Sequence, residues 1–361
     1  MKITVTGTRG IPDIQGGVET HCQELMPRLA TLGHDIVVTR RSCYVSNSLR
    51  EYKGVKLADV YAPRRKSIEA IVHTFLSVVK ARFNGSKAVH IHAVGPAIMA
   101  PFARLLGLKV IMTHHGPDYE RKKWGRLARF VLKTGERWGV KYSNRVIVIS
   151  DVIKKRIEDE YGRKDSILIF NGVNRLEKSK STDFIESFGL TPRKYIVVLG
   201  RFVPEKGFHD LVEAYLKVKR DFPEIKLVIA GDADHPDEYS EMLKNKALKA
   251  GVVLTGFIKG EQLNQVMSNA ALFVLPSYHE GLPIALLEAM SYDLDVLTSD
   301  IPANCINELN PDDHFITGDI ESLARALSLK LSKADTPRRH DLTRYDWDTI
   351  AHQTSTVYNS L

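Results

Sequence analysis

Two glutamates eight positions apart, Glu280 and Glu288, carry the strongest chemical signal in this chain of 361 residues. Glu280 follows a short apolar run, 272–275, that is typical of a buried parallel strand. Glu288 lies in a helix that we expect to begin at Pro283, because proline is well tolerated in a first turn. Open α/β sheets bind phosphorylated ligands where a strand ends beside a helix N-terminus. One carboxylate would then face a sugar and the other a ribose, although such a pair also suits hydrolysis by an acid and a base.

Two cations, Arg201 and Lys206, lie five positions apart in a loop that contains Gly and Pro and follows the candidate strand 195–199. Arginine grips phosphate oxygens in bidentate fashion and lysine adds a compact point charge, so the pair suits a diphosphate. Taken alone, the pattern is also typical of solvated surface charges. Because the two glutamates are expected in the same sheet, we favour the diphosphate.

Two glycines, Gly16 and Gly17, follow the first candidate strand, 3–6. Glycines at this place let the backbone approach a phosphate at the N-terminus of the next helix, although a flexible loop would look the same. Their spacing does not match the dinucleotide fingerprint, which argues against a nicotinamide-dependent dehydrogenase.

A histidine, His115, follows the candidate strand 109–113. A hydrogen bond from its imidazole to a sugar hydroxyl is the favoured role, and a loop histidine without a role is the alternative. No carboxylate or His cluster lies at a matching helical spacing, so the sequence predicts no metal ligands.

Strands alternate with helices along the whole chain, which predicts parallel sheets joined by right-handed crossovers. The candidate strands are 3–6, 36–39, 55–60, 88–92, 109–113, 145–149 and 167–170 in the first half, and 195–199, 226–230, 253–254, 272–275 and 295–298 in the second. A polar run, 177–183, follows Asn171–Asn174 and marks a boundary. We therefore expect α/β architecture with two doubly wound domains, 1–174 and 175–345, that face each other across a cleft.

Charge divides unevenly between the two halves. Residues 1–174 carry 30 Lys and Arg against 15 Asp and Glu, and the rest of the chain carries 21 against 28. This asymmetry predicts an anionic partner for the first half. The candidate surface for a membrane or an acceptor comprises Arg64, Arg65, Lys66, Arg121, Lys122, Lys123, Arg126 and Arg129, with apolar residues interleaved. Solvated helix faces remain the alternative, and a nucleic-acid-binding protein is disfavoured because no recognition motif accompanies the charge.

The three cysteines are too few and too far apart for a disulfide framework, which favours a reducing compartment. No charged n-region with a long apolar h-region opens the sequence, so we expect no secretory signal. None of its apolar windows reaches about 18 uncharged residues, the minimum for a membrane helix. We expect a cytoplasmic protein, with peripheral attachment to the inner membrane face if the basic surface binds lipid.

Together these motifs resemble the retaining glycosyltransferases of family 4, which have the GT-B fold, and the resemblance covers nearly the whole chain. The resemblance rests on the glutamate pair with its Gly-Leu-Pro insert, on the Arg201–Gly207 loop and on Asn171–Val173. Residues 345–358 look like the family's last helix, which implies that a helix at 346–361 returns to the first domain. The opening run 7–20 is similar to a bacterial subgroup often described as rhamnosyltransferases.

The resemblance implies a division of labour between the domains. The first domain binds the acceptor, while its Gly16 and Gly17 contact the diphosphate and His115 contacts the donor sugar. In the second domain, Arg201 and Lys206 neutralise the diphosphate and Glu288 binds the ribose. Glu280, Gly281 and Leu282 then hold the sugar hydroxyls, and Phe257 and Ile258 line the base pocket.

These roles describe transfer of a hexose, rhamnose or another, from a nucleoside diphosphate sugar to a glycan or lipid-linked acceptor in bacterial surface polysaccharide synthesis. We expect no metal and no cofactor, because two cations and a helix N-terminus stabilise the leaving group. Retention without an obvious nucleophile implies front-face attack, with covalent catalysis by Glu280 as the less favoured variant. A nucleotide-sugar epimerase of similar fold is the alternative function.

Overall fold

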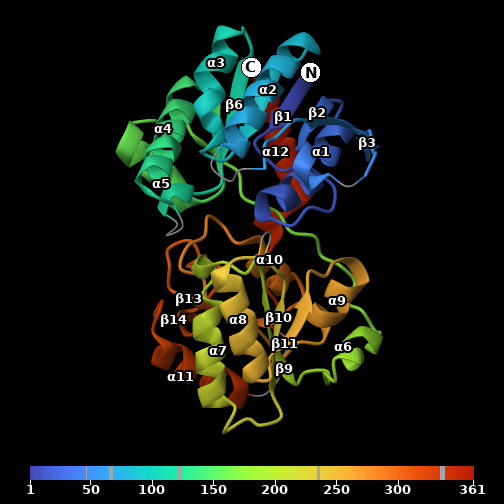
Figure 1. Cartoon of the computed structure of the whole chain (residues 1–361), viewed down its shortest axis with the longest axis vertical. Helices are drawn as coiled ribbons and strands as arrows, with labels where there is room; N and C mark the ends of the chain where they lie inside the picture. The colour runs from blue at the N-terminus through green and yellow to red at the C-terminus, as the bar shows by residue number, and fades with distance from the viewer. Residues whose placement is uncertain (46, 65–67, 121–123, 234–235, 334–337) are drawn as a thin grey trace. The chain divides into compact units, whose positions relative to one another are not determined.

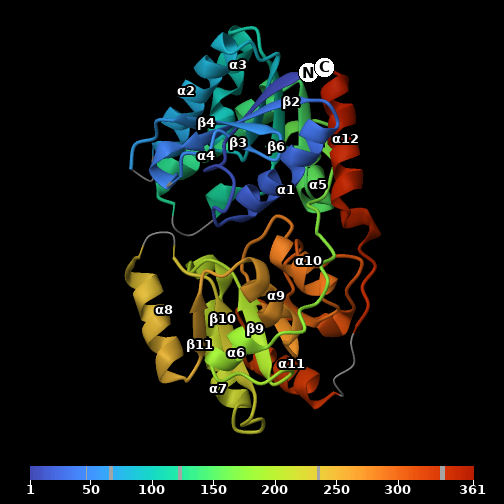
Figure 2. The same ribbon diagram turned by 90° about the vertical axis from the view of Figure 1, so that its right-hand side faces the viewer.

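The computed structural model describes residues 1–361 except 46, 65–67, 121–123, 234–235 and 334–337. The chain divides into two compact units (Figure 1): the first comprises Met1–Gly172 with Arg344–Leu361, and the second comprises Val173–Thr343. Each unit contains a largely parallel β-sheet with helices on both faces (Figures 1 and 2). The predicted pair of doubly wound α/β domains is confirmed.

The described part of the first unit contains an eight-stranded sheet in the order β3-β4-β2-β1-β5-β6-β7-β8. Its strands are β1 (Lys2–Thr6), β2 (Asp35–Arg41), β3 (Glu51–Tyr52), β4 (Val55–Val60), β5 (Ala88–His92), β6 (Lys109–His114), β7 (Arg145–Val148) and β8 (Ile167–Leu168). Neighbouring strands pair in parallel, except for β3 and β4, which pair antiparallel. Because β1 lies between β2 and β5, the loops after β1 and β5 leave the sheet at its topological switch point.

The helices α1 (Gly17–Thr31), α2 (Glu69–Phe83), α3 (Ala100–Leu105), α4 (Arg126–Tyr142) and α5 (Asp151–Tyr161) follow in this unit. The last helix of the chain, α12 (Trp347–Asn359), packs beside α1 (Figures 1 and 2). Its residues Trp347, Ile350 and Tyr358 are buried in the same core as Ile3 and Leu25. The expected return of the C-terminal helix to the first domain is therefore confirmed.

The second unit contains a parallel sheet in the order β11-β10-β9-β12-β13-β14. Its strands are β9 (Tyr195–Leu199), β10 (Lys226–Ala230), β11 (Val253–Gly256), β12 (Leu272–Leu275), β13 (Asp295–Ser299) and β14 (His314–Phe315). Its helices are α6 (Asp183–Ser187), α7 (Phe208–Val218), α8 (Glu238–Lys249), α9 (Gly260–Ser268), α10 (Ile284–Ser291) and α11 (Ile320–Ser332). The switch point of this sheet lies between β9 and β12, where the chain changes the direction in which it adds strands.

Burial explains why the central strands form where the apolar runs predict them. Every residue of β9 and of β12 is buried, as expected for strands that are covered by helices on both faces. Across the described residues, no helix combines the length and the apolar character that a membrane crossing requires.

Candidate functional site

The loops after β9 and β12 leave neighbouring strands at the switch point of the second sheet. Lys206 ends a short 3₁₀ turn in the first loop, and Glu280 lies in the second. The Lys206 Nζ donates to Glu280 Oε1 over 2.6 Å, and the two side chains are 18% and 12% exposed. An ion pair this sheltered is screened much less by salt than one at the surface. The structure thus brings together two of the predicted site residues.

Backbone contacts hold the two loops against each other. The amide N–H of Tyr278 donates to the carbonyl oxygen of Glu205 over 2.8 Å. Gly207 has a φ of 67°, and a Cβ at this residue would lie 2.0 Å from the carbonyl oxygen of Pro276. Only glycine fits this left-handed conformation and this close approach without strain. Gly207 therefore sets how closely the Lys206 turn approaches the loop of Glu280.

A side-chain contact fixes the same loop to the start of α7. The hydroxyl of Tyr278 donates to Asp210 Oδ2 over 2.5 Å, and burial together with this carboxylate raises the pKa of Tyr278 to about 12. The ring of Tyr278 also stacks on that of His209. Neither Tyr278 nor Asp210 was predicted from the sequence, although Tyr278 stands only two positions before Glu280.

Helix α10 begins at Ile284, one residue later than expected, because Pro283 has an extended ψ of 110° and acts as the N-cap. Gly281 is half-buried and Leu282 is buried in the segment that leads into this helix. Glu288 is half-buried on the second turn of α10. Glu280 and Glu288 thus lie before and within one helix, as their spacing predicted.

The remaining predicted residues of the second unit lie at the same edge of its sheet. Arg201 is half-buried at the start of the loop that contains Lys206. Phe257 is 49% exposed and Ile258 is buried, and both follow β11. Strand β10 separates β11 from β9 in the sheet, so Phe257 and Ile258 lie further along this edge than Arg201.

The first unit places the predicted glycines at the N-terminus of α1. Gly16 is the N-cap, with a φ of 148°, and Gly17 is the exposed first residue of the helix. Glu19, which is buried, accepts hydrogen bonds from the backbone amide of Arg9 over 3.0 Å and from the Thr8 hydroxyl over 3.2 Å. Glu19 therefore fixes the loop after β1, and it was missed because an acidic residue in a first helical turn is common.

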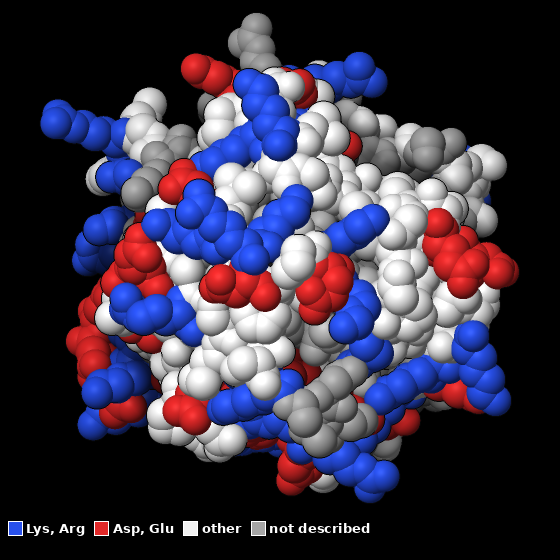
Figure 3. Space-filling model, turned by 90° about the horizontal axis from the view of Figure 1, so that it is seen from below, with Lys and Arg blue, Asp and Glu red and all other residues white. Residues whose placement is uncertain are grey.

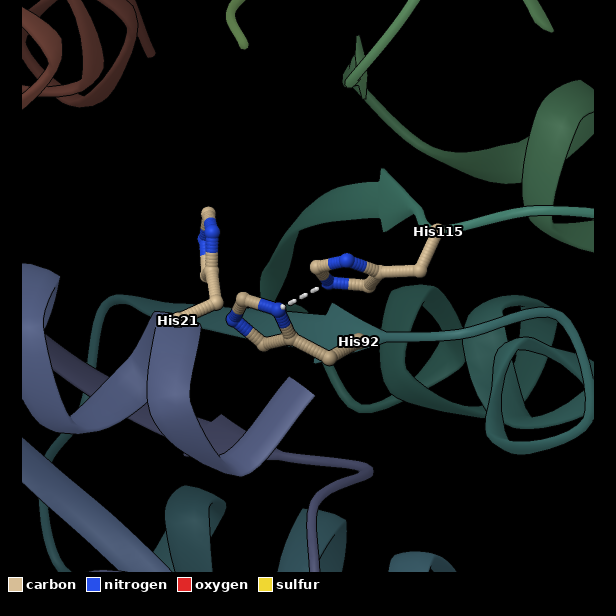
Figure 4. A group of neighbouring side chains, drawn as sticks. All are labelled: His21, His92 and His115. Carbon is tan, nitrogen blue, oxygen red and sulfur yellow. Dashed lines mark hydrogen bonds between the residues drawn. The ribbon is translucent and has the colours of Figure 1, made fainter. Parts of the chain in front are cut away.

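His115 directly follows β6 and has two histidine neighbours from distant segments (Figure 4). Its Nε2 lies 2.9 Å from Nδ1 of His92, and its ring centre lies 5.0 Å from that of His21. Burial lowers the pKa of His21 to about 4 and depresses those of His92 and His115 well below their usual value. These imidazoles are therefore neutral near pH 7. The sequence did not predict this cluster, although His92 and His115 stand at the ends of consecutive strands.

A buried network lies beside this cluster. His114 Nδ1 accepts from the amide of Gly116 over 3.1 Å, so its Nε2 is the protonated nitrogen and donates to Glu136 Oε1 over 2.7 Å. Glu136 Oε2 accepts from the hydroxyls of Tyr119 and Tyr161 over 2.9 and 2.5 Å. Burial alone would raise the pKa of Glu136, but the hydrogen bonds from His114 and the two tyrosines outweigh it and lower that pKa. This network anchors the segment that carries His115.

The predicted basic surface is described in part. Arg126 and Arg129 are exposed on α4, and Arg64 is exposed before α2. The other predicted residues of this surface lie outside the described residues: Arg65, Lys66, Arg121, Lys122 and Lys123. The solvent side of α4 also exposes Leu127 by 78% and Phe130 by 69%.

The second unit has a cavity of about 440 Å³ lined in part by residues at the amino ends of β9, β12 and β13. Charges of both signs line it, and Lys330 Nζ lies 2.6 Å from Asp295 Oδ1 and 2.7 Å from Asp313 Oδ1. Lys and Arg side chains are similarly interleaved with Asp and Glu over the face in Figure 3. Because this cavity lies at the amino ends of the strands, and open α/β sheets bind ligands at the carboxyl ends, it is a poorer candidate for the donor than the loops after β9 and β12.

Two family descriptions match the chain. "Glycosyltransferase Family 4" matches residues 15–175, and "Glycosyl transferases group 1" matches residues 180–346. An uncharacterised glycosyltransferase of Methanocaldococcus jannaschii is 24% identical, with 99% of this chain and 98% of that protein aligned. The GPI3 subunit of phosphatidylinositol N-acetylglucosaminyltransferase from Saccharomyces cerevisiae is 25% identical, with 96% of this chain and 80% of that protein aligned.

Solved structures share the fold over the whole chain. Sucrose-phosphate synthase from Thermosynechococcus elongatus superposes with a TM-score of 0.83 at 19% identity, covering 99% of this chain and 98% of that one. The Anabaena protein HepE in complex with UDP-glucose superposes with a TM-score of 0.81 at 17% identity, covering 100% of both chains.

Proposed function

We propose that this chain, which its matches to group 1 and family 4 identify as a GT-B glycosyltransferase, transfers a hexose with retention of configuration. The donor is a nucleoside diphosphate sugar, and the acceptor is a glycan or a lipid-linked saccharide of bacterial surface polysaccharide synthesis. Rhamnose is the first candidate sugar, because the opening run 7–20 is similar to the rhamnosyltransferase subgroup. The observation that carries the proposal is the sheltered Lys206–Glu280 pair at the switch point of the second sheet.

In the proposed mechanism the donor diphosphate takes the place of Glu280 as the partner of Lys206. Arg201, on the same loop, contributes a second cation, and the N-terminus of α10 contributes partial positive charge. These groups stabilise the charge that develops on the leaving diphosphate. Glu280 then accepts hydrogen bonds from hydroxyls of the donor sugar, and Glu288 binds the ribose.

The first unit supplies the remaining contacts. Gly16 and Gly17 approach the diphosphate at the N-terminus of α1, and His115 contacts the donor sugar. The bond between the anomeric carbon and the diphosphate oxygen breaks while the acceptor oxygen bonds to the same face of that carbon. The acceptor proton passes to the leaving phosphate. No step of this proposal requires a metal or a cofactor.

Replacement of Lys206 tests this mechanism. A thermal-shift screen of UDP, GDP and dTDP and their sugars first identifies the donor, because a ligand that binds only the folded state raises apparent stability. Lys206→Ala should then lower kcat by on the order of 100-fold or more, because diphosphate charge peaks in the transition state.

The matched control is Lys217→Ala, which removes an exposed lysine of the same unit from its pair with Glu321. Near wild-type turnover in Lys206→Ala would remove the basis of the proposal. Conversion of the donor in the absence of any acceptor would instead favour an epimerase.

We also propose that α4 attaches the protein to an anionic lipid surface on the inner face of the membrane. Leu127 and Phe130 are exposed on this helix next to Arg126, Arg129 and Lys133. Exposed apolar side chains next to cations are typical of helices that bind a membrane surface. The apolar side chains insert among the acyl chains, and the cations contact the lipid phosphates. A lipid-linked acceptor would be presented at this surface.

Flotation with vesicles of phosphatidylcholine and phosphatidylglycerol tests the attachment. The double variant Leu127→Ser, Phe130→Ser should lose binding, and high salt should weaken binding of the wild type. Leu248→Ser is the control, because Leu248 is 64% exposed on α8 of the second unit. Failure of the wild type to float at low salt, or equal loss in both variants, refutes attachment through α4.

A further inference from the structure

Three imidazoles from separate segments converge in the first unit. His21 lies on α1, His92 ends β5 and His115 follows β6. Their ring centres lie 5.0, 5.2 and 5.5 Å apart, and Figure 4 shows the three side chains gathered around a common space. One ligand nitrogen from each ring lies within 4.8 Å of the others. His21 and His92 are buried, and His115 is half-buried, so the cluster reaches the surface at His115.

Hydrogen bonds leave nitrogens available in this cluster. His21 Nδ1 lies 3.0 Å from Oδ1 of Asn171, and because an amide oxygen can only accept, Nδ1 is the protonated nitrogen. The Nε2 of His21 then has a lone pair, and it is buried without a hydrogen-bond partner among the described residues. The Nε2 of His92 is likewise buried without a partner there. Such unsatisfied buried atoms destabilise the fold unless an ion or a water meets them.

Two neighbouring histidines, His90 and His114, use both of their ring nitrogens in hydrogen bonds and so offer none to an ion. Both nitrogens of His90 are hydrogen-bonded, one to the Tyr358 hydroxyl and one to the Thr113 hydroxyl, each over 2.6 Å. His114 is committed to Glu136 and to the amide of Gly116. The cluster is therefore defined as His21, His92 and His115.

We propose that His21, His92 and His115 form a binding site for a divalent transition-metal ion, Zn²⁺. Three imidazoles bound to Zn²⁺ at about 2.0–2.1 Å in tetrahedral geometry have ring centres about 5 Å apart and ligand nitrogens about 3.4 Å apart. The observed ring spacing already meets this requirement, and rotations of the rings bring the nitrogens into place. Coordination through either of the facing nitrogens of His92 and His115 breaks the hydrogen bond between them, because a metal-bound nitrogen has no lone pair or proton left for it.

The surroundings also suit a metal. Asn171 orients His21 through the nitrogen that would not bind the ion, which is the arrangement that outer-shell partners give to metal-binding histidines. Imidazole nitrogens favour Zn²⁺, Cu²⁺ and Ni²⁺ over Mg²⁺ and Ca²⁺. A fourth coordination position is left for water.

One consequence rests on the proposed function, because His115 is also the proposed contact of the donor sugar. An ion on His115 and the donor sugar would compete for the same imidazole. Zn²⁺ would then act as a reversible inhibitor of a transfer reaction that itself needs no metal. Metal binding is measured without donor, so its failure is distinguishable from failure of the proposed transferase activity.

The test is Zn²⁺ binding to the untagged, metal-stripped chain near pH 7.5, measured by equilibrium dialysis with elemental analysis and by calorimetry. We expect one Zn²⁺ per chain, and Mg²⁺ in excess should not displace it. Asn171→Ala should weaken binding about 10–100-fold, and His115→Ala should weaken it further because a ligand is lost. Co²⁺ used as a probe should show the intense visible absorption of tetrahedral coordination.

The control is His34→Gln, which removes a histidine of the same unit that is hydrogen-bonded to Ser355. This variant should bind Zn²⁺ like the wild type. His115 is half-buried, so His115→Ala is the ligand variant that disturbs the core least. Absence of stoichiometric binding by the wild type overturns the proposal, and so does unchanged binding by a folded His115→Ala variant.

Discussion

Removal of the two charges of the Lys206–Glu280 pair, singly and together, tests whether this pair organises the site before a donor binds. Lys206→Met and Glu280→Gln remove charge while nearly preserving side-chain volume. Each single change removes one partner of the remaining charge at a place where the two side chains are only 18% and 12% exposed. We therefore expect the destabilisation of the double variant to be smaller than the sum of the two single effects.

The expected coupling follows from the geometry. Unit charges 2.6 Å apart attract by about 6 kcal/mol at an effective dielectric constant of about 20, and by about 1.6 kcal/mol in bulk water. Loss of hydration and of side-chain freedom opposes this attraction, so a net coupling of about 1–3 kcal/mol is expected. The matched control is the Lys217–Glu321 pair, whose side chains are 48% and 64% exposed, and for which about 0.2–1 kcal/mol is expected.

Unfolding in urea, followed by two signals, measures the coupling. All three tryptophans, Trp124, Trp138 and Trp347, belong to the first unit, so their fluorescence reports on that unit. Far-UV circular dichroism reports on both units. Loss of the Lys206–Glu280 pair should shift the circular dichroism transition of the second unit and leave the fluorescence transition unchanged. A coupling below about 0.5 kcal/mol, or one equal to that of the control pair, refutes the reasoning.

Three further changes probe other parts of the site. Glu288→Ala should raise the KM for the donor with little change in kcat, because ribose contacts are equal in the ground and transition states; a pure kcat effect in steady-state kinetics contradicts this. Gly207→Ala should lower the free energy of unfolding by about 1–3 kcal/mol, because its Cβ would lie 2.0 Å from the carbonyl oxygen of Pro276. The control is Gly125→Ala, which has open space around it and should be near neutral in the same urea titration. Burial and the Arg41 charge lower the pKa of His73 from 6.5 to about 3, so the contribution of neutral His73 to the free energy of unfolding is complete above pH 6.5. This contribution is lost by about 1.4 kcal/mol per pH unit as the pH falls from 6.5 towards 3. His73→Leu should flatten this pH dependence of stability, and an unchanged slope would show that His73 is not its source.

The central strands could be predicted because burial on both faces requires continuous apolar runs, and such runs are visible in a single sequence. Two short strands were missed, β3 (Glu51–Tyr52) and β14 (His314–Phe315). Two residues are too few to show a period, and both strands lie at an edge of a sheet, where fewer neighbours constrain their composition.

The residues of the candidate site could be predicted individually, but their contacts could not. Lys206 and Glu280 are 74 positions apart, and only the pairing of β9 with β12 brings their loops together. The histidine cluster was missed for a similar reason, because His21 approaches His92 and His115 only after α1 packs on the sheet. A search for polar residues at the ends of adjacent strands would have joined His92 to His115, since β5 and β6 are neighbours.

The ion pair also bears on what Glu280 does in the reaction. While Lys206 Nζ lies 2.6 Å from Oε1, the positive charge stabilises the carboxylate and lowers its nucleophilicity. If the diphosphate draws Lys206 away, the carboxylate loses this partner at the moment when the sugar hydroxyls arrive. Hydrogen bonds from those hydroxyls would again stabilise the negative charge, which favours an orienting role over covalent attack. Glu280→Gln should then reduce turnover without abolishing it, because an amide oxygen still accepts from a hydroxyl, whereas complete loss of transfer would point to a covalent intermediate.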